Sequence, residues 1–175
     1  MNLPNKLTVA RFAAVPFFII AFMAGHYYTA AIIFIAASFT DYLDGAIARK
    51  YNLVTNFGKI MDPLADKILV ISALVCLVDS RQVAAWMLIV ILVREFTVTG
   101  LRTVAAAQGI VIAAGMTGKI KTVLQMIAVP LLILQNWPFS MINIPMADIM
   151  LWASVIMTII SGTEYVYKNR QIFSM

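Results

Sequence analysis

The sequence has few charged residues and a single cysteine. Only 12% of its 175 residues are charged and 62% are hydrophobic, whereas a typical soluble domain is about 25% charged. These proportions exclude a soluble globular fold and a disordered chain. Cys76 alone cannot form an internal disulfide. The chain does not open with a short apolar core followed by small residues, so we expect no cleaved signal peptide.

Long apolar runs are abundant instead, and short polar clusters separate them. At about 20 residues per membrane crossing, the chain has room for six transmembrane helices and short loops. The expected fold is therefore an all-α integral membrane protein with one domain, residues 1–175. A more polar opening segment, residues 2–11, predicts a short interfacial helix before the first span. The predicted spans are residues 9–25, 28–50, 59–78, 84–106, 118–136 and 144–166.

Basic residues are distributed unevenly between the two sides of this predicted bundle. All of them except Arg81 belong to segments that end on the side of the N-terminus. Cytoplasmic loops of membrane proteins carry an excess of Lys and Arg. The sequence therefore predicts a multi-pass protein with both termini in the cytoplasm.

Half of the eight acidic residues lie within 26 positions of one another. Asp41 and Asp44 are three residues apart, and Asp62 and Asp66 are four apart, so each pair occupies one helical face. The two helices run in opposite directions, and a rise of about 1.5 Å per residue brings the pairs to similar depths. We expect all four carboxylates to meet just inside the cytoplasmic boundary.

Four carboxylates in one membrane cleft repel each other, and each unpaired one costs up to about 3 kcal/mol to insert. Lys59 and Lys67 are candidates to neutralise part of this charge. Clustered carboxylate oxygens are ligands typical of hard divalent ions, so two Mg²⁺ or Mn²⁺ ions are predicted. Small neighbours such as Gly45 and Gly58 also fit the alternative that this region only packs helices closely.

Residues 41–66 read DYLDGAIARKYNLVTNFGKIMDPLAD. This segment matches D-x-x-D-G-x-x-A-R, eight residues, then G-x-x-x-D-x-x-x-D, and thereby resembles the CDP-alcohol phosphotransferase family of membrane enzymes. The resemblance covers nearly the whole chain. The opening NLPNKLTVAR and the segment REFTVTGLR at 94–102 look like the bacterial branch that uses glycerol 3-phosphate.

The resemblance implies transfer of a phosphatidyl group from CDP-diacylglycerol to an alcohol, with release of CMP, in the bacterial plasma membrane. It implies that the four aspartates hold two divalent ions and that Asp66 is also the general base. Residues implied to lie near the cytidine diphosphate are Asn5, Thr8, Gly45, Ala48, Arg49 and Gly58.

Several cations lie in the predicted inner halves of later helices, where contact with lipid is improbable for a charged side chain. Such residues face a polar cavity or an acid. Pairing of Arg94 with Glu95 or an aspartate is one interpretation. The other is a pocket for an acceptor that carries its own phosphate, such as sn-glycerol 3-phosphate, because guanidinium groups match phosphate oxygens. The candidate phosphate ligands are Lys59, Arg94, Arg102, Lys119 and Lys121.

Other acceptors and another class of function also fit the sequence. An inositol phosphate fits a cationic pocket as well, and serine or phosphatidylglycerol are further possible acceptors. A divalent-cation transporter is the competing class, because intramembrane acids mark ion paths, although the outer half of the predicted bundle has no deep acid. Expected partners are membrane lipids and a second copy of the chain, and no nucleic acid.

Overall fold

A computed structural model of the chain shows an all-helical fold throughout the residues it describes. Backbone is described for all residues except 1–2, 52–55, 110–111, 114 and 171–175. Within the helices, side chains are not described for residues 3–7, 41–51, 56–63 and 66. The helices are α1 (Leu3–Met23), α2 (Tyr27–Tyr51), α3 (Asn56–Asp79), α4 (Ala85–Ala107), α5 (Met116–Ile133), the short 3₁₀ helix η1 (Phe139–Ile142) and α6 (Met146–Lys168).

These α-helices correspond one to one with the six predicted spans. The largest difference is at the start, where the segment expected as a separate interfacial helix forms the first turns of α1 without a break. No glycine interrupts residues 3–23, and Pro4 stands in the first turn, where proline is tolerated. A second difference is at the end of α5, which ends at Ile133, three residues before the predicted end.

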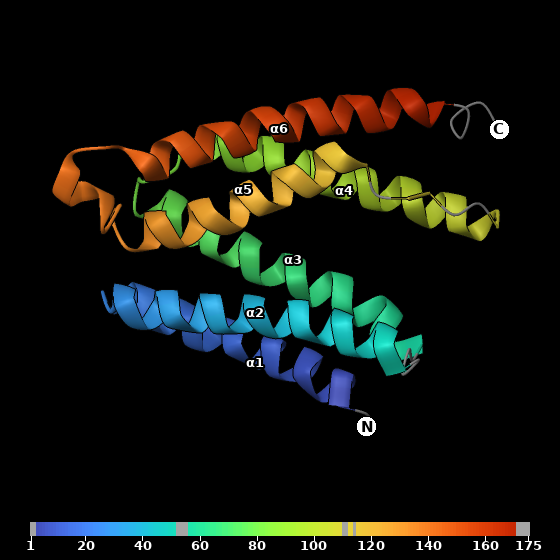
Figure 1. Cartoon of the computed structure of the whole chain (residues 1–175), viewed down its shortest axis with the longest axis horizontal. Coiled ribbons are helices and arrows are strands. Elements are labelled where there is room, and N and C mark those ends of the chain that lie inside the picture. The colour runs from blue at the N-terminus through green and yellow to red at the C-terminus, as the bar shows by residue number, and fades with distance from the viewer. Residues whose placement is uncertain (1–2, 52–55, 110–111, 114, 171–175) are drawn as a thin grey trace.

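The helices form two groups that pack along one another (Figure 1). α1 packs against both α2 and α3, while α6 packs against α5 and α4. Contacts of α5 with α2 and α3, and of α3 with α4, join the groups. Figure 1 places the start of α1, the end of α2, the start of α3 and the end of α6 at one end, here called the terminal end of the bundle.

At the opposite end, three helices stop in the same way. Gly25, Arg81 and Gln135 follow α1, α3 and α5 with positive φ angles of 78°, 59° and 52°. In each case the next residue's amide donates to a carbonyl five residues back, at 2.7–2.9 Å. This left-handed cap satisfies carbonyl groups that the helix end leaves without partners, and it reverses the chain toward the following helix.

Apolar side chains fill the interior and also cover the outside. Phe18, Phe34 and Leu74 are almost completely buried in a core to which every α-helix contributes. On the outer surface, Phe17 is 65% and Ile32 is 68% exposed. Exposed apolar surface of this extent is typical of a surface that meets lipid or another protein.

Two helices in the described part of the chain, α5 and α6, are long and apolar enough to cross a membrane by length and composition. Aromatic side chains pair at the end opposite the termini: Trp86 lies 5.7 Å from Trp152, and Tyr28 lies 6.5 Å from Trp137, between ring centroids. Amphipathic aromatic rings are enriched at membrane interfaces. These features are consistent with a membrane protein.

Candidate functional site

The four motif aspartates lie in the two helices predicted to carry them. Asp41 is ten residues before the last residue of α2, and Asp66 is ten residues after the first residue of α3. Asp44 and Asp62 are seven and six residues from the same helix ends. Their side chains lie outside the described residues. Among the side chains that are described, no group of three or more Asp, Glu, His or Cys residues is placed to hold a metal ion.

The residues expected near the nucleotide come mostly from the same region. Thr8 is the one whose side chain is described, and it is completely buried on α1. The expectations for the remaining residues, and for Lys59, fall outside the described side chains. These residues are Asn5, Gly45, Ala48, Arg49 and Gly58.

A cavity of about 670 Å³ lies among α3, α4, α5 and α6. Five basic and two acidic residues line it, so its lining is positively charged at neutral pH. Residues from the first turn of α5 contribute to the wall, and a helix N-terminus favours anions. The charged lining residues are Lys67, Arg94, Glu95, Arg102, Lys119, Glu164 and Lys168.

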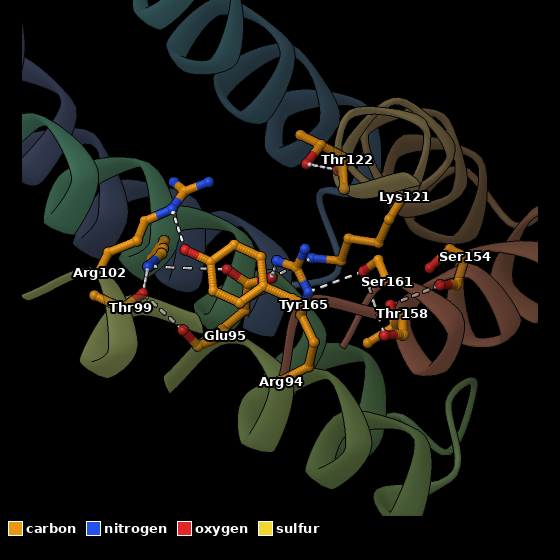
Figure 2. A network of polar contacts seen from close by, with 12 residues as sticks. Arg94, Glu95, Thr99, Arg102, Lys121, Thr122, Ser154, Thr158, Ser161 and Tyr165 are labelled. Atoms are coloured by element: carbon orange, nitrogen blue, oxygen red, sulfur yellow. Dashed lines mark hydrogen bonds and ion pairs between the residues drawn. The ribbon is translucent and has the colours of Figure 1, made fainter. Parts of the chain in front are cut away.

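Glu95 is the centre of a charged cluster at the wall of this cavity. Its carboxylate oxygen Oε1 accepts hydrogen bonds from Arg94 Nη1 at 2.9 Å and from Lys121 Nζ at 2.7 Å. Lys67 Nζ lies 3.9 Å from the other oxygen. Figure 2 shows Arg94, Glu95 and Lys121 converging from α4 and α5. The alternative prediction that Arg94 pairs with Glu95 is therefore confirmed, and Arg94 lines the cavity as well.

The Arg94 guanidinium is held on more than one side. Its Nε donates to Ser161 Oγ of α6 at 3.1 Å, as Figure 2 shows. Gly118 of α5 and Gly162 of α6 border the same side chain so closely that a Cβ on either would lie 2.9 Å and 3.1 Å, respectively, from an Arg94 atom. α4, α5 and α6 together therefore determine where this group points.

Arg102 and Lys67 have hydroxyl partners. Arg102 Nε donates to the Tyr165 hydroxyl at 3.2 Å, and its guanidinium carbon lies 5.6 Å from the centre of the Tyr165 ring. Lys67 Nζ donates to Thr99 Oγ1, which in turn donates to the Glu95 carbonyl oxygen at 2.6 Å. Lys67, expected to neutralise the aspartates, thus lines the cavity beside Glu95.

Among the predicted phosphate ligands, Arg94, Arg102 and Lys119 come together in the large cavity. Lys121 is 4% exposed and lines an adjacent space of about 50 Å³, where its ammonium contacts Glu95. Of the four predicted cations whose side chains are described, three therefore line the cavity and Lys121 is joined to it through Glu95.

Sequence reasoning missed the α6 residues that support these cations. Ser161 and Tyr165 contact Arg94 and Arg102, and with Ser154 and Thr158 they form a buried polar stripe on α6. Their spacing of four, three and four residues is that of a single helical face. Polar residues at this spacing in a largely apolar segment could have indicated these contacts from the sequence.

Comparison with known proteins agrees with the motif at 41–66. Residues 1–160 match the family model of CDP-alcohol phosphatidyltransferases. The chain belongs to the CDP-alcohol phosphatidyltransferase family. This confirms the resemblance inferred from the aspartate motif, and it makes the polar cavity a candidate substrate site of a phosphatidyltransferase.

Individual members of the family are similar over nearly their full length. A protein of Bacillus subtilis (strain 168) is 51% identical over 183 residues, which cover 96% of this chain and 95% of that protein. One of Rickettsia bellii (strain RML369-C) is 40% identical, with 98% and 97% covered. Both are named CDP-diacylglycerol--glycerol-3-phosphate 3-phosphatidyltransferase. A Mycobacterium tuberculosis (strain ATCC 25618 / H37Rv) protein named probable phosphatidylglycerophosphate synthase is 39% identical, with 95% and 81% covered.

Proposed function

We propose that this chain transfers a phosphatidyl group from CDP-diacylglycerol to sn-glycerol 3-phosphate, giving phosphatidylglycerol phosphate and CMP. Family membership and the names of relatives that span nearly the whole chain support the reaction. The structural observation that supports glycerol 3-phosphate as the acceptor is the basic cavity among α3, α4, α5 and α6.

The cavity suits an acceptor that brings its own phosphate. Arg94, Arg102 and Lys119 all line it, and guanidinium groups donate pairs of hydrogen bonds to phosphate oxygens. Serine has no phosphate to neutralise these charges. The remaining polar lining, including Thr117 and Glu164, supplies hydrogen-bonding groups suited to the glycerol hydroxyls.

The motif aspartates are the proposed metal ligands. The donor set fits, because hard divalent cations prefer carboxylate oxygens and the helix bounds bring the two pairs to matching distances from the terminal end. Two Mg²⁺ or Mn²⁺ ions held there would neutralise the charge that develops on the leaving CMP. The proposed metal ligands are Asp41, Asp44, Asp62 and Asp66.

Asp66 is also the proposed general base. It accepts the proton of the acceptor hydroxyl, whose oxygen then forms a bond to the lipid-side phosphorus. The bond from that phosphorus to the bridging oxygen breaks, and CMP leaves with that oxygen. The residues proposed to bind the cytidine diphosphate are Asn5, Thr8, Gly45, Ala48, Arg49 and Gly58.

The proposed setting is the bacterial plasma membrane. The donor has two acyl chains that remain in the bilayer, so its polar pyrophosphate must lie at the interface, at the terminal end of the bundle. Six membrane crossings are inferred from the apolar runs, and cytoplasmic termini from the distribution of basic residues. The large exposed apolar surface is available to lipid and to a second copy in a homodimer.

The test is CMP release by the purified protein in mixed micelles containing CDP-diacylglycerol. Glycerol 3-phosphate, serine, inositol and inositol phosphate are compared as acceptors, with and without Mg²⁺ or Mn²⁺. We expect release only with glycerol 3-phosphate and a divalent ion. Equal release with another acceptor would refute the choice of acceptor, and metal uptake into proteoliposomes without a lipid product would favour a transporter.

The role of Asp66 is tested with a matched pair of variants. Asp66→Asn should abolish CMP release while the protein keeps the elution volume of the wild type in size-exclusion chromatography. Asp148→Asn alters an exposed carboxylate in the first turn of α6, at the other end of the bundle, and should leave the rate unchanged. Full activity of Asp66→Asn would refute its role as the base.

A further inference from the structure

Two glycines from different helices leave space for the Arg94 side chain. A Cβ on Gly118 would lie 2.9 Å from Nη2, and a Cβ on Gly162 would lie 3.1 Å from Cγ. The first distance is shorter than real Cβ contacts allow, so the guanidinium would have to move. The second requires a shift of a few tenths of an ångström in the stem of the arginine.

Two hydrogen bonds also hold the same group. Nε is bonded to Ser161 and Nη1 to Glu95. A guanidinium has five N–H groups, and the others, including both on Nη2, have no hydrogen-bond partner among the described residues. With 14% of its side chain exposed, Arg94 keeps limited access to the cavity that it lines.

We propose that Gly118 is a positioning residue for the acceptor phosphate, and that Gly162 assists it. The absence of a side chain at 118 lets Nη2 of Arg94 occupy the position from which its N–H groups reach an anion in the cavity. Because the neighbouring atom is the far end of a flexible side chain, a larger residue at 118 would redirect the guanidinium without disrupting α5. This inference rests on the proposed function, in which the cavity holds the phosphate of glycerol 3-phosphate.

The first experiment compares Gly118→Ala with Gly100→Ala. Both substitutions remove a glycine from a helix, which by itself favours the helix, but a Cβ on Gly100 has nothing within 4 Å. We expect Gly118→Ala to raise KM for glycerol 3-phosphate about tenfold, the loss of one charge-assisted hydrogen bond. Its kcat, its KM for CDP-diacylglycerol and its unfolding midpoint should match those of Gly100→Ala.

A double-mutant cycle with Arg94→Lys then tests whether Gly118 acts through Arg94. Lysine keeps the charge but has no Nη2 atom to displace. If Gly118 acts by orienting Nη2, adding Gly118→Ala to Arg94→Lys should change KM for glycerol 3-phosphate by less than about twofold, since coupled residues are not additive. A full tenfold rise in KM for glycerol 3-phosphate when Gly118→Ala is added to Arg94→Lys would overturn the proposal. Identical KM values for Gly118→Ala and Gly100→Ala would overturn it as well.

A binding measurement separates this inference from the proposed function. Inorganic phosphate should raise the unfolding midpoint of the wild type and of Gly100→Ala, because a ligand that binds the folded state stabilises it. Gly118→Ala should show a clearly smaller shift, and an equal shift would overturn the positioning role. A wild type that is stabilised by phosphate but releases no CMP with glycerol 3-phosphate would refute the proposed reaction and leave this test intact.

Discussion

Replacing Glu95 with glutamine removes the carboxylate that Lys67, Arg94 and Lys121 share. The side chain of Glu95 is 14% exposed, and it lies within 4 Å of charged nitrogens from Lys67, Arg94 and Lys121. Glutamine has nearly the same shape and keeps one oxygen that accepts a hydrogen bond. The substitution therefore tests charge with little change in packing.

Glu95→Gln should lower the free energy of unfolding, because it leaves buried cations without this counter-charge. Removing one partner of a buried ion pair costs about 3–5 kcal/mol. Lys67 is 25% exposed and the cavity adjoins the cluster, so water offsets part of this cost and we expect about 3 kcal/mol. For a chain of this size, that loss lowers the unfolding midpoint by roughly 10 °C.

Thermal unfolding followed by tryptophan fluorescence in detergent micelles measures the midpoint. Glu164→Gln is the matched control, because Glu164 also lines the cavity and bonds to Thr117 and Lys168, but its pair with Lys168 is a more exposed contact within one helix. Exposed pairs contribute little and are screened by salt. We expect a small, salt-dependent change for Glu164→Gln and a large, salt-independent one for Glu95→Gln.

Equal midpoints for these two variants would refute the reasoning, because they would show that the cluster does not depend on the charge of Glu95. A large loss that disappears at high salt would also contradict it, since that result is typical of an exposed pair.

Three further predictions concern single side chains. Phe18→Ala should lower the unfolding free energy by about 3–5 kcal/mol, because Phe18 is completely buried. The adjacent Phe17→Ala should lower it by much less, because Phe17 is 65% exposed. Thermal unfolding measures both changes. Tyr165→Phe removes the hydroxyl that accepts from Arg102 and should raise KM for glycerol 3-phosphate about fivefold in the CMP assay. Cys76 is buried and should react with a maleimide only after unfolding, as mass spectrometry of labelled protein would show.

Much of the fold could be predicted because apolar runs and polar breaks are local features of the sequence. The predicted span 84–106 corresponds to α4 at Ala85–Ala107, and 144–166 to α6 at Met146–Lys168. The predicted span 118–136 extends three residues beyond the end of α5 at Ile133, because no glycine or proline marks that end. Gln135 and Asn136 take positive φ there, a conformation that is uncommon for residues other than glycine and that the hydrophobic pattern does not indicate.

The charges of the candidate site were predictable, but of its contacts only the Arg94–Glu95 pair was. Arg94 and Arg102 were recognisable because charged residues inside apolar helices need polar surroundings. Whether Lys121 reaches the cavity or turns to Glu95 depends on how α4 and α5 are rotated against each other. The close approach of Gly118 to Arg94 depends on the same rotation. No local sequence pattern indicates how two helices are rotated against each other. The aspartate motif was recognisable because its residues have fixed spacings within a short segment, residues 41–66.

The basic cavity and the aspartate motif come from different parts of the chain. Apart from Lys67, every described residue that lines the cavity belongs to the chain from Arg94 onward, whereas the motif extends from α2 into the first half of α3. Under the proposed function, donor chemistry and acceptor choice are thus separable along the polypeptide. A hybrid enzyme joined in the connection between α3 and α4 would keep its nucleotide chemistry and take its alcohol preference from the protein that supplies the second half.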